Sequence, residues 1–530
     1  MPELDHVPST FDPCVIPLGA AAPMLDFEPH LLTTMNRLSK PGSRYYSIAD
    51  YHEKYKSGQL TPLQVARTIL SLVNKPGSYD DAWADSHGMD HLVLEAAKAS
   101  TERYAAGKPL GVMDGVPIGI KDDTDVKGYI NHIGMKYNAS APCFTPKTES
   151  AWPVRMLQEA GAVIIGKNCM HELGSDTNGL NVAQGTPTNH CNNDYYPGGS
   201  SSGGGSAVSA GVVPLCIGTD AGGSIRLPAS FGGVYGLKPS HHRTMRMAST
   251  MCVTGPIAAS ASDLTIAYRL MSQPNPACPT QGKFGLSIPP QPSSKRVMGI
   301  YRDWWNAADA PVKKLCDQAV AYFSEMHGYE VVDISIPHLC QAQLAHSIIC
   351  SVEMAEAARR RASDWLSLCA PTNNLIMPVA ANTSAADLIK FNALRTVVMQ
   401  HLAFLFQKHP GLLIVTPTTP LTGWPRSAGD QAYGLSDLGI TTRNMSYIFL
   451  ANMTGTPSVT VPIGYTEPEQ GKGKLPVSLL ATGEWGSEEQ LLAWARQAEE
   501  YLHDAYEDGR RRPETWADVL TLAKEGDVNA

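Results

Sequence analysis

The sequence predicts an α/β fold, a single large domain whose mixed, mostly parallel central sheet is covered by helices on both faces. From about residue 90, short apolar strands alternate with amphipathic helices, which is the pattern of βαβ units. The clearest unit runs from a strand at 297–301 through a helix at 311–327 to a strand at 329–336. No linker-like stretch or internal repeat divides the 530 residues, so we expect one main domain.

The first clear helix begins at Thr61. Thr61 and Gln64 form a Thr-x-x-Gln capping box, and Pro62 suits the first helical position. An apolar stripe at helical spacing follows, formed by Val65, Ile69, Leu72 and Val73. A similar box, Ser487 with Gln490, predicts the start of a last helix.

The remaining elements follow from apolar runs bounded by Gly, Pro and polar residues. Further helices are expected at 91–106, before Gly161 and at 206–210. The other expected strands lie at 116–120, 162–165, 212–217, 412–416, 458–462 and 477–481. We expect residues 1–60 to form a weakly structured arm, 61–510 the main domain and 511–530 a C-terminal tail.

Composition limits the classes of partner. The net charge is −8 with no Lys/Arg run longer than three residues, which argues against nucleic acid or an anionic membrane. No apolar stretch is long enough to span a bilayer, and acidic residues stand where a signal peptide would be basic. The 11 cysteines are scattered without metal-binding spacing, so we expect reduced thiols, a cytoplasmic location and no metal or other cofactor.

Glycine is concentrated in one block. Nine glycines lie between Gly198 and Gly223. A flexible linker would not be followed at once by an apolar strand and a second Gly cluster. A phosphate cradle would need a Gly-rich motif in a different context, with a lysine after it. The run 199–203 matches G-x-S-x-G, but polar, turn-like residues precede it, so Ser201 is rejected as the nucleophile of an α/β-hydrolase elbow.

The remaining interpretation is that both Gly clusters serve one site. Glycines let backbone N–H groups approach a reacting atom. Ser224, in Ala221-Gly-Gly-Ser224, would combine a nucleophilic hydroxyl with an oxyanion hole. Lys121 directly follows the strand at 116–120 and precedes a polar loop, at the edge of the sheet where α/β sites lie. A surface lysine is the alternative interpretation of this position.

These motifs closely resemble the amidase signature family of serine hydrolases. The matching runs are Gly115–Asp122, Gly161–Lys167 with His171-Glu172, Gly198–Pro239, Thr254–Ile257 and Gly455–Gly464. The resemblance covers roughly residues 60–505 and implies the amidase signature fold.

The resemblance also implies the roles of the site residues. Ser224 would be the nucleophile, Ser200 the bridging serine after a cis peptide bond, and Lys121 the general base. The backbone amides of Ala221, Gly222, Gly223 and Ser224 would form the oxyanion hole. Ser201, Asp220 and Arg226 would support these groups, while Met135 and Gly199 are candidates for substrate contact. A lysine becomes an effective base at neutral pH only when its surroundings lower its pKa.

Three positions depart from the family pattern. Asp123 stands where Asn is frequent, Gly134-Met135 replaces a common Gly-Ser pair, and Ala259 replaces a common Arg. None of them is one of the three catalytic candidates. Met135 puts the usual substrate-side geometry in question.

The expected function is hydrolysis of a carboxylic amide to an acid plus ammonia or an amine, with a small-molecule amide as the substrate. Two alternatives stay open. One is acyl transfer to an amine or alcohol in a biosynthetic pathway, and the other is a glutaminase-type component of a tRNA-dependent amidotransferase. Analogy is also consistent with a homodimer. The acyl pocket is expected to draw on segments 135–141, 301–305, 345–356 and 424–440. Their aromatic and apolar residues hint at a medium-sized, partly apolar acyl group, but the same residues suit ordinary core packing.

Overall fold

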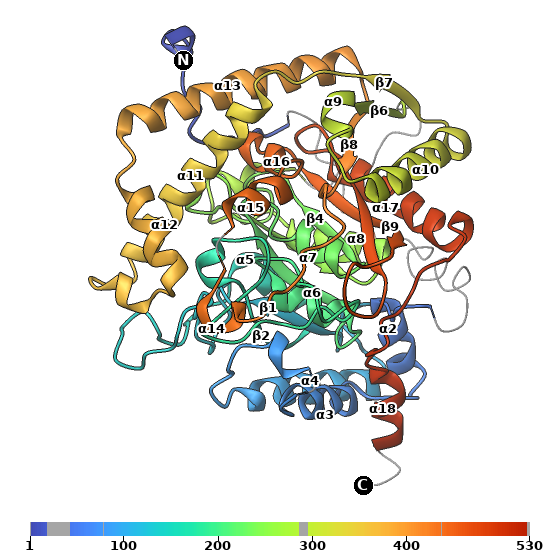
Figure 1. Cartoon of the computed structure of the whole chain (residues 1–530). Helices are drawn as coiled ribbons and strands as arrows, with labels where there is room; N and C mark the ends of the chain where they lie inside the picture. Colours follow the sequence, from blue (N-terminus) through green and yellow to red (C-terminus); the bar gives the residue numbers. More distant parts are fainter. Residues whose placement is uncertain (1, 18–42, 78, 286–294, 436, 527–530) are drawn as a thin grey trace.

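A ten-stranded mixed sheet forms the centre of the computed structural model, as predicted (Figure 1). The sheet is not mostly parallel as expected, because five of the strand pairings among the described residues are antiparallel and four are parallel. The structure describes all residues except 1, 18–42, 78, 286–294, 436 and 527–530. The strand order is β2-β1-β3-β5-β4-β9-β10-β8-β6-β7. Their bounds are β1 Pro117–Lys121, β2 Val163–Asn168, β3 Leu215–Asp220, β4 Tyr235–Lys238, β5 Val253–Ala258, β6 Val297–Ile300, β7 Glu330–Asp333, β8 Leu412–Pro417, β9 Ser458–Thr466 and β10 Leu475–Thr482.

Parallel pairing is confined to the two ends of the sheet. At one end β1 pairs in parallel with β2 and β3, and at the other β6 pairs in parallel with β7 and β8. The strands between them, from β3 through β5, β4, β9 and β10 to β8, pair antiparallel. Strands β1 and β3, whose C-terminal ends lead to the candidate site residues Lys121 and Ser224, lie where the first parallel block meets the antiparallel centre.

Helices pack around the sheet in several groups. The α-helices among the described residues are α2 Ile48–Lys56, α3 Pro62–Val73, α4 Asp90–Ala105, α5 Trp152–Glu159, α6 Ser202–Ser209, α7 Arg226–Phe231, α8 Ala261–Met271, α9 Arg302–Trp305, α10 Ala310–His327, α11 Leu339–Arg359, α12 Pro371–Ala381, α13 Ala385–Lys408, α14 Asp430–Tyr433, α15 Leu438–Asn444, α16 Phe449–Thr454, α17 Glu488–Glu500 and α18 Val519–Gly526. Helices α6 and α7 pack together on the strands, while α8, α10 and α17 form another connected layer. Helices α11 to α13 gather at the upper left of Figure 1.

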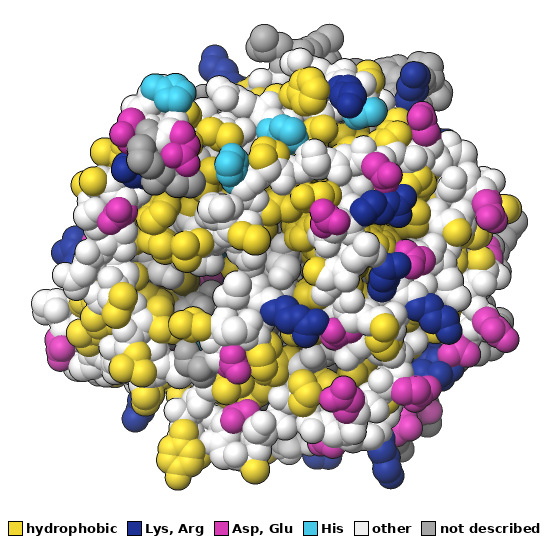
Figure 2. All heavy atoms as spheres, turned by 45° about the horizontal axis from the view of Figure 1, so that its top comes forward, with side chains coloured by type: hydrophobic (Ala, Val, Ile, Leu, Met, Phe, Trp, Pro, Cys, Tyr) yellow, Lys and Arg dark blue, Asp and Glu magenta, His cyan; other side chains and the backbone are white. Residues whose placement is uncertain are grey.

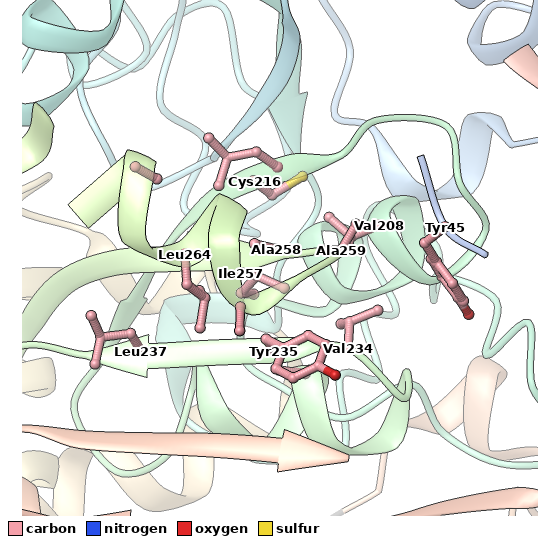
Figure 3. Packing of buried hydrophobic residues seen from close by; sticks show 14 of the residues in the cluster. Tyr45, Val208, Cys216, Val234, Tyr235, Leu237, Ile257, Ala258, Ala259 and Leu264 are labelled. Atoms are coloured by element: carbon pink, nitrogen blue, oxygen red, sulfur yellow. The ribbon is translucent and has the colours of Figure 1, made fainter. Parts of the chain in front are cut away.

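The main apolar core joins these layers to the sheet. Figure 3 shows Val208 of α6, Leu264 of α8 and the strand residues Tyr235 and Ile257 in this core, and all of them are buried. A separate apolar cluster lies under α11 and α13, where Ile349 and Leu402 pack with Ile414 of β8. The main core thus packs against the strands that end at the candidate site.

The predicted start of α3 is confirmed. Gln64 N–H donates to Thr61 Oγ1 at 3.2 Å, and Thr61 N–H donates to Gln64 Oε1 at 2.6 Å. The second predicted box does not form, because Gln490 Nε2 instead donates to the Gly411 carbonyl at 2.8 Å. Helix α17 nevertheless begins directly after Ser487.

Several segments differ from the sequence-based expectation. Within residues 1–60, expected to be weakly structured, residues 48–56 form helix α2, whose Ile48 and Tyr51 belong to the main core. Within the expected tail, α18 packs against α3, and Val519 and Leu520 are core residues. Residues 18–42 and 527–530 of these two segments lie outside the described part of the chain.

The Gly-rich segment is helical from Ser202, four residues earlier than expected. Glycine suits this helix because neighbouring backbone is very close. A Cβ at Gly203 would lie 2.7 Å from Cys169 N, and one at Gly205 would lie 2.8 Å from the Pro228 carbonyl oxygen. The helix thus begins only two residues after Ser200 and is held tightly against α7.

Candidate active site

Lys121 and Ser200 are in direct contact. Lys121 is the last residue of β1, and it is 2 % exposed. Its Nζ donates to Ser200 Oγ at 2.8 Å. Ser200 lies directly before the turn into α6, and the Gly199–Ser200 peptide bond is cis, as the resemblance implies. The structure therefore brings together two of the three predicted catalytic side chains.

A backbone hydrogen bond joins Ser224 to the turn that contains Ser200. It follows β3 by four residues and precedes α7, and its side chain is buried. Its carbonyl oxygen accepts from Ser201 N–H at 3.1 Å, which joins the two Ser-containing turns. Among the described residues, the Ser224 hydroxyl makes no hydrogen bond, so it is not held by a protein partner.

Thr219 was not singled out from the sequence, yet it contacts Lys121 twice. Lys121 Nζ donates to Thr219 Oγ1 at 2.7 Å and to the Thr219 carbonyl at 3.2 Å. The Thr219 hydroxyl in turn donates to Asp123 Oδ2 at 2.5 Å, and that carboxylate lies 3.4 Å from Lys121 Nζ. Asp123 is one of the three positions that depart from the family pattern. That departure is the sequence signal that could have drawn attention to the contact between Asp123 and Thr219.

Asp220 and Arg226 form a fully buried ion pair beneath the Ser224 turn. Arg226 Nε and Nη2 each donate to an Asp220 carboxylate oxygen at 3.0 Å. Burial alone raises the pKa of Asp220, but the Arg226 charge and hydrogen bonds from Arg226 and Asn452 outweigh it and hold the pKa well below its usual range. Asn452, also missed from sequence, donates to Asp220 Oδ1 at 2.9 Å. The turn is thus anchored by a permanent negative charge.

The four candidate oxyanion-hole amides are not equivalent. Gly223 N–H donates to Asp220 Oδ1 at 2.7 Å, so this amide is already used. In the described part of the chain, no hydrogen bond uses the N–H groups of Ala221, Gly222 or Ser224. Those three amides remain available to a substrate oxygen. Gly223 instead supplies backbone conformation, with φ +106° and Ile448 where a Cβ would stand.

His346 supports the same turn from α11 and was not predicted individually. Burial lowers the pKa of His346 to about 4, so the ring is neutral near pH 7. Its Nε2–H donates to the Ala221 carbonyl at 2.8 Å. A Cβ at Gly222 would lie 3.0 Å from the same ring. His346 therefore fixes the peptide between Ala221 and Gly222, in the turn that leads to Ser224.

The other predicted residues surround the centre. Ser201 Oγ donates to the Thr219 carbonyl at 3.3 Å. Gly199 packs against backbone, because a Cβ there would lie 2.8 Å from Gly179 N. Met135 is buried in an apolar cluster with Phe144, Leu368 and Leu173. Leu173 precedes Gly174, whose Cβ would lie 3.3 Å from Ser200 Oγ, so Met135 belongs to a layer behind the centre.

A large cavity lies elsewhere. It has a volume of about 1380 Å³ and is lined by residues that include 188–194, 471–474 and 510–515, without Lys121, Ser200 or Ser224. The buried side chains at the ends of β1 and β3, rather than cavity size, mark the candidate site.

None of the described helices is both long enough and apolar enough to cross a membrane.

This fold and site define an amide-hydrolysing enzyme, and the chain belongs to the Amidase family, whose profile matches residues 79–492. It is similar to a fatty acid amide hydrolase of Medicago truncatula, with 31% identity over 494 residues that cover 90% of this chain and 79% of the relative. It is also similar to a glutamyl-tRNA(Gln) amidotransferase component of Thermus thermophilus, at 28% identity over 84% of this chain and 94% of that one. A bacterial aryl acylamidase of the amidase signature family shares the fold, with a TM-score of 0.74 and 21% identity over 91% of this chain and 99% of that chain.

Proposed function

We propose that the chain hydrolyses a carboxylic amide with a medium-sized, partly apolar acyl group through an acyl-enzyme on Ser224. The observation that carries this proposal is the buried 2.8 Å contact between Lys121 Nζ and Ser200 Oγ, next to a Ser224 hydroxyl that has no partner among the described residues. Such a chain of lysine and two serines can move a proton away from the nucleophile.

In the proposed reaction, neutral Lys121 accepts the Ser200 proton while Ser200 accepts the Ser224 proton. Ser224 Oγ then attacks the amide carbon, and the N–H groups of Ala221, Gly222 and Ser224 stabilise the oxyanion. The C–N bond breaks as the relay returns the proton to the leaving nitrogen. Water attacks the resulting ester by the same relay and releases the acid.

Apolar residues beside the Ser224 turn support an apolar acyl group. Ile448 and Leu227 lie against Gly223, and Met445 lies 3.3 Å from the position of a Cβ on Gly222. Two of the segments expected to line the pocket, 345–356 and 424–440, lie on α11 and in the region of α14 and α15 that precedes Met445. The similarity to fatty acid amide hydrolases at 31% identity supports the same substrate class.

The decisive experiment combines covalent labelling with turnover. Ser224→Ala should abolish labelling by a fluorophosphonate probe and reduce amide hydrolysis by several orders of magnitude, up to about 10⁶-fold. Lys121→Ala should greatly slow both labelling and turnover. Ser202→Ala is the matched control, because the buried Ser202 hydroxyl has no hydrogen-bond partner among the described residues. Unchanged labelling of Ser224→Ala would exclude Ser224 as the nucleophile.

A panel of primary amides, anilides, fatty amides and esters, with acid and ammonia both quantified, would define the substrate. Acyl transfer to an added amine in place of acid release would favour the transferase alternative. Hydrolysis of glutamine only, dependent on a partner protein, would favour the amidotransferase alternative, which the similarity to such proteins keeps open.

We also infer a cytoplasmic enzyme that needs no cofactor for catalysis. All 11 cysteines are free thiols in the structure, which supports a reducing compartment. Acidic and basic side chains are interspersed on the face shown in Figure 2, and no continuous basic surface is visible there. This supports a small-molecule substrate over nucleic acid. A homodimer remains a proposal by analogy.

A further inference from the structure

Three potential metal ligands meet at a place that shares no residue with the candidate active site. His241 and His242 follow β4 by three and four residues, and Asp12 lies in the N-terminal segment. Asp12 Oδ1 lies 3.7 Å from His241 Nε2, and Asp12 Oδ2 lies 3.2 Å from His242 Nε2. The ligand atoms all lie within 4.8 Å of one another.

His241 has an unmet need for a partner. Its side chain is 1 % exposed, and neither ring nitrogen makes a hydrogen bond in the described structure. Buried polar groups without a partner are rare in folded proteins and call for an unplaced water or ion. The Nε2 atom points toward the Asp12 carboxylate but stays beyond hydrogen-bond distance, so there is room for an atom between them.

The spacing fits a metal ion. Two ligand atoms that each lie about 2.0–2.1 Å from a tetrahedral Zn²⁺ are about 3.3–3.4 Å apart, close to the observed 3.2 and 3.7 Å. Imidazole nitrogen with carboxylate oxygen suits Zn²⁺ and similar transition metals better than Ca²⁺ or Mg²⁺. We propose that Asp12, His241 and His242 form a binding site for one divalent transition-metal ion of the Zn²⁺ type.

The protonation of the ligands is compatible with this site. Burial and the neighbouring His242 hold the pKa of His241 well below its usual value, and burial also lowers that of His242. Both shifts favour the neutral ring, which is the form of histidine that binds a metal ion. In the structure His242 Nε2 forms a 3.2 Å hydrogen bond with Asp12 Oδ2. Metal binding on Nε2 replaces that bond and places the ring proton on Nδ1, which also removes a long 3.4 Å hydrogen bond from Met247 N–H.

The surrounding charges set the affinity. Lys238 and Arg395 are close enough to His241, and Arg246 to His242, to lower the pKa of these rings. The same three cations oppose the binding of a metal cation. Cys14 lies near both Asp12 and Cys278, and burial raises the pKa of the Cys14 thiol. Because Asp12 is about half exposed, the remaining coordination positions are open to water. We therefore expect moderate affinity.

The site would clasp the N-terminal segment to the body of the protein. That segment already contacts α13, since Arg395 Nη1 donates to the Phe11 carbonyl at 2.6 Å and Thr396 Oγ1 donates to the Pro8 carbonyl at 2.7 Å. A metal ion on Asp12 would add a link from the same segment to the chain after β4. Binding to the folded state alone must raise the unfolding temperature.

The test uses the full chain without an affinity tag, stripped of metal by a chelator. Titration with Co²⁺, followed by visible absorption, and with Zn²⁺, followed by calorimetry, should show one equivalent bound and a higher melting temperature. Asp12→Asn should weaken binding at least about tenfold, since even the loss of an indirect metal contact costs about 10- to 100-fold. Asp5→Asn is the matched control, because Asp5 is an exposed acid of the same segment, 3.7 Å from Lys390.

His242→Asn removes a second ligand. Asn tolerates the left-handed backbone found at His242, where φ is +62°, so this variant should fold and also lose binding. The proposal would be overturned if the wild-type chain binds neither ion, or if Asp12→Asn and His242→Asn bind as tightly as the wild type. Amide hydrolysis is not a readout, so the outcome is independent of the proposed function.

Discussion

Thr219 holds Lys121 through two oxygen atoms, its hydroxyl at 2.7 Å and its carbonyl at 3.2 Å from Nζ. Because β3 pairs with β1, the end of one strand directly positions the last residue of its neighbour. The Lys121 side-chain nitrogen is thereby directed at Ser200 rather than left to rotate. The position of the proposed base is therefore set by the C-terminal ends of β1 and β3.

Thr219→Val should slow turnover while leaving the fold intact. Valine keeps the shape and removes the hydroxyl that accepts from Lys121 and donates to Asp123. The loss of such a hydrogen bond is worth about 1–3 kcal/mol, which corresponds to a roughly 5- to 150-fold fall in kcat/KM. Thr219→Ser retains the hydroxyl and should stay near the wild-type rate. Equal rates for the valine variant and the wild type would contradict the positioning role.

Asp220→Ala should destabilise the protein strongly. Arg226 would be left charged, fully buried and without its carboxylate partner. Breaking a buried pair in this way costs about 3–5 kcal/mol, measurable as a lower urea midpoint. Asp333→Ala is the control, since its pair with Arg302 is exposed and should contribute less than about 1 kcal/mol. Similar midpoints for the two variants would argue against the anchoring role of Asp220.

Gly223→Ala should impair activity more strongly than the same change at a distant glycine. An added Cβ would overlap Ile448, and φ at Gly223 is +106°, so the turn before Ser224 must shift. Gly185→Ala has a comparable φ of +96° with nothing within 4 Å of the added carbon. Fluorophosphonate labelling rates should fall for the first variant and stay unchanged for the second. A normal labelling rate for Gly223→Ala would show that the turn tolerates displacement.

Asp263→Asn should flatten the dependence of stability on pH between about 4 and 7. Burial raises the pKa of Asp263 to about 7, so the folded state holds a proton that the unfolded state releases near its ordinary pKa of about 4. Stability conferred by this group is therefore full below pH 4 and declines as pH rises through 7. Unfolding free energies measured across this range should decrease less steeply in the variant. Glu499, raised to about 7 by burial, remains as a second contributor, so an identical slope would reject the assignment to Asp263.

The sequence predicted the α/β class, most strands and the approximate place of the three catalytic candidates. Strands such as β2 and β8 begin as continuous apolar runs, and the start of α3 has local capping signals, so short-range patterns sufficed. Strands β4 and β5 were missed because Gly236, Gly255 and Pro256 interrupt their apolar pattern. The strand conformation of β5 depends on its pairing with β3. That of β4 depends on its pairing with β9, which lies far away in the sequence.

The supporting residues of the site could not be predicted for a related reason. His346 and Asn452 carry no local motif, and each reaches the Ser224 turn only after α11 and α16 have packed against the sheet. Ser487 and Gln490 show the opposite error, since a valid local capping pattern lost to the carbonyl of Gly411. Local chemistry indicated the candidate nucleophile, and tertiary packing decided what surrounds it.

The strand order has a consequence for synthesis on the ribosome. Strand β4 lies between β5 and β9, so the N-terminal strands find their inner neighbour only when residues 458–466 have left the exit tunnel. Asn452, which fixes Asp220, emerges just before them. A nascent chain therefore carries Lys121, Ser200 and Ser224 for most of its translation before Asn452 joins the Asp220 turn, and the proposed nucleophile gains this support only when the polypeptide is nearly complete.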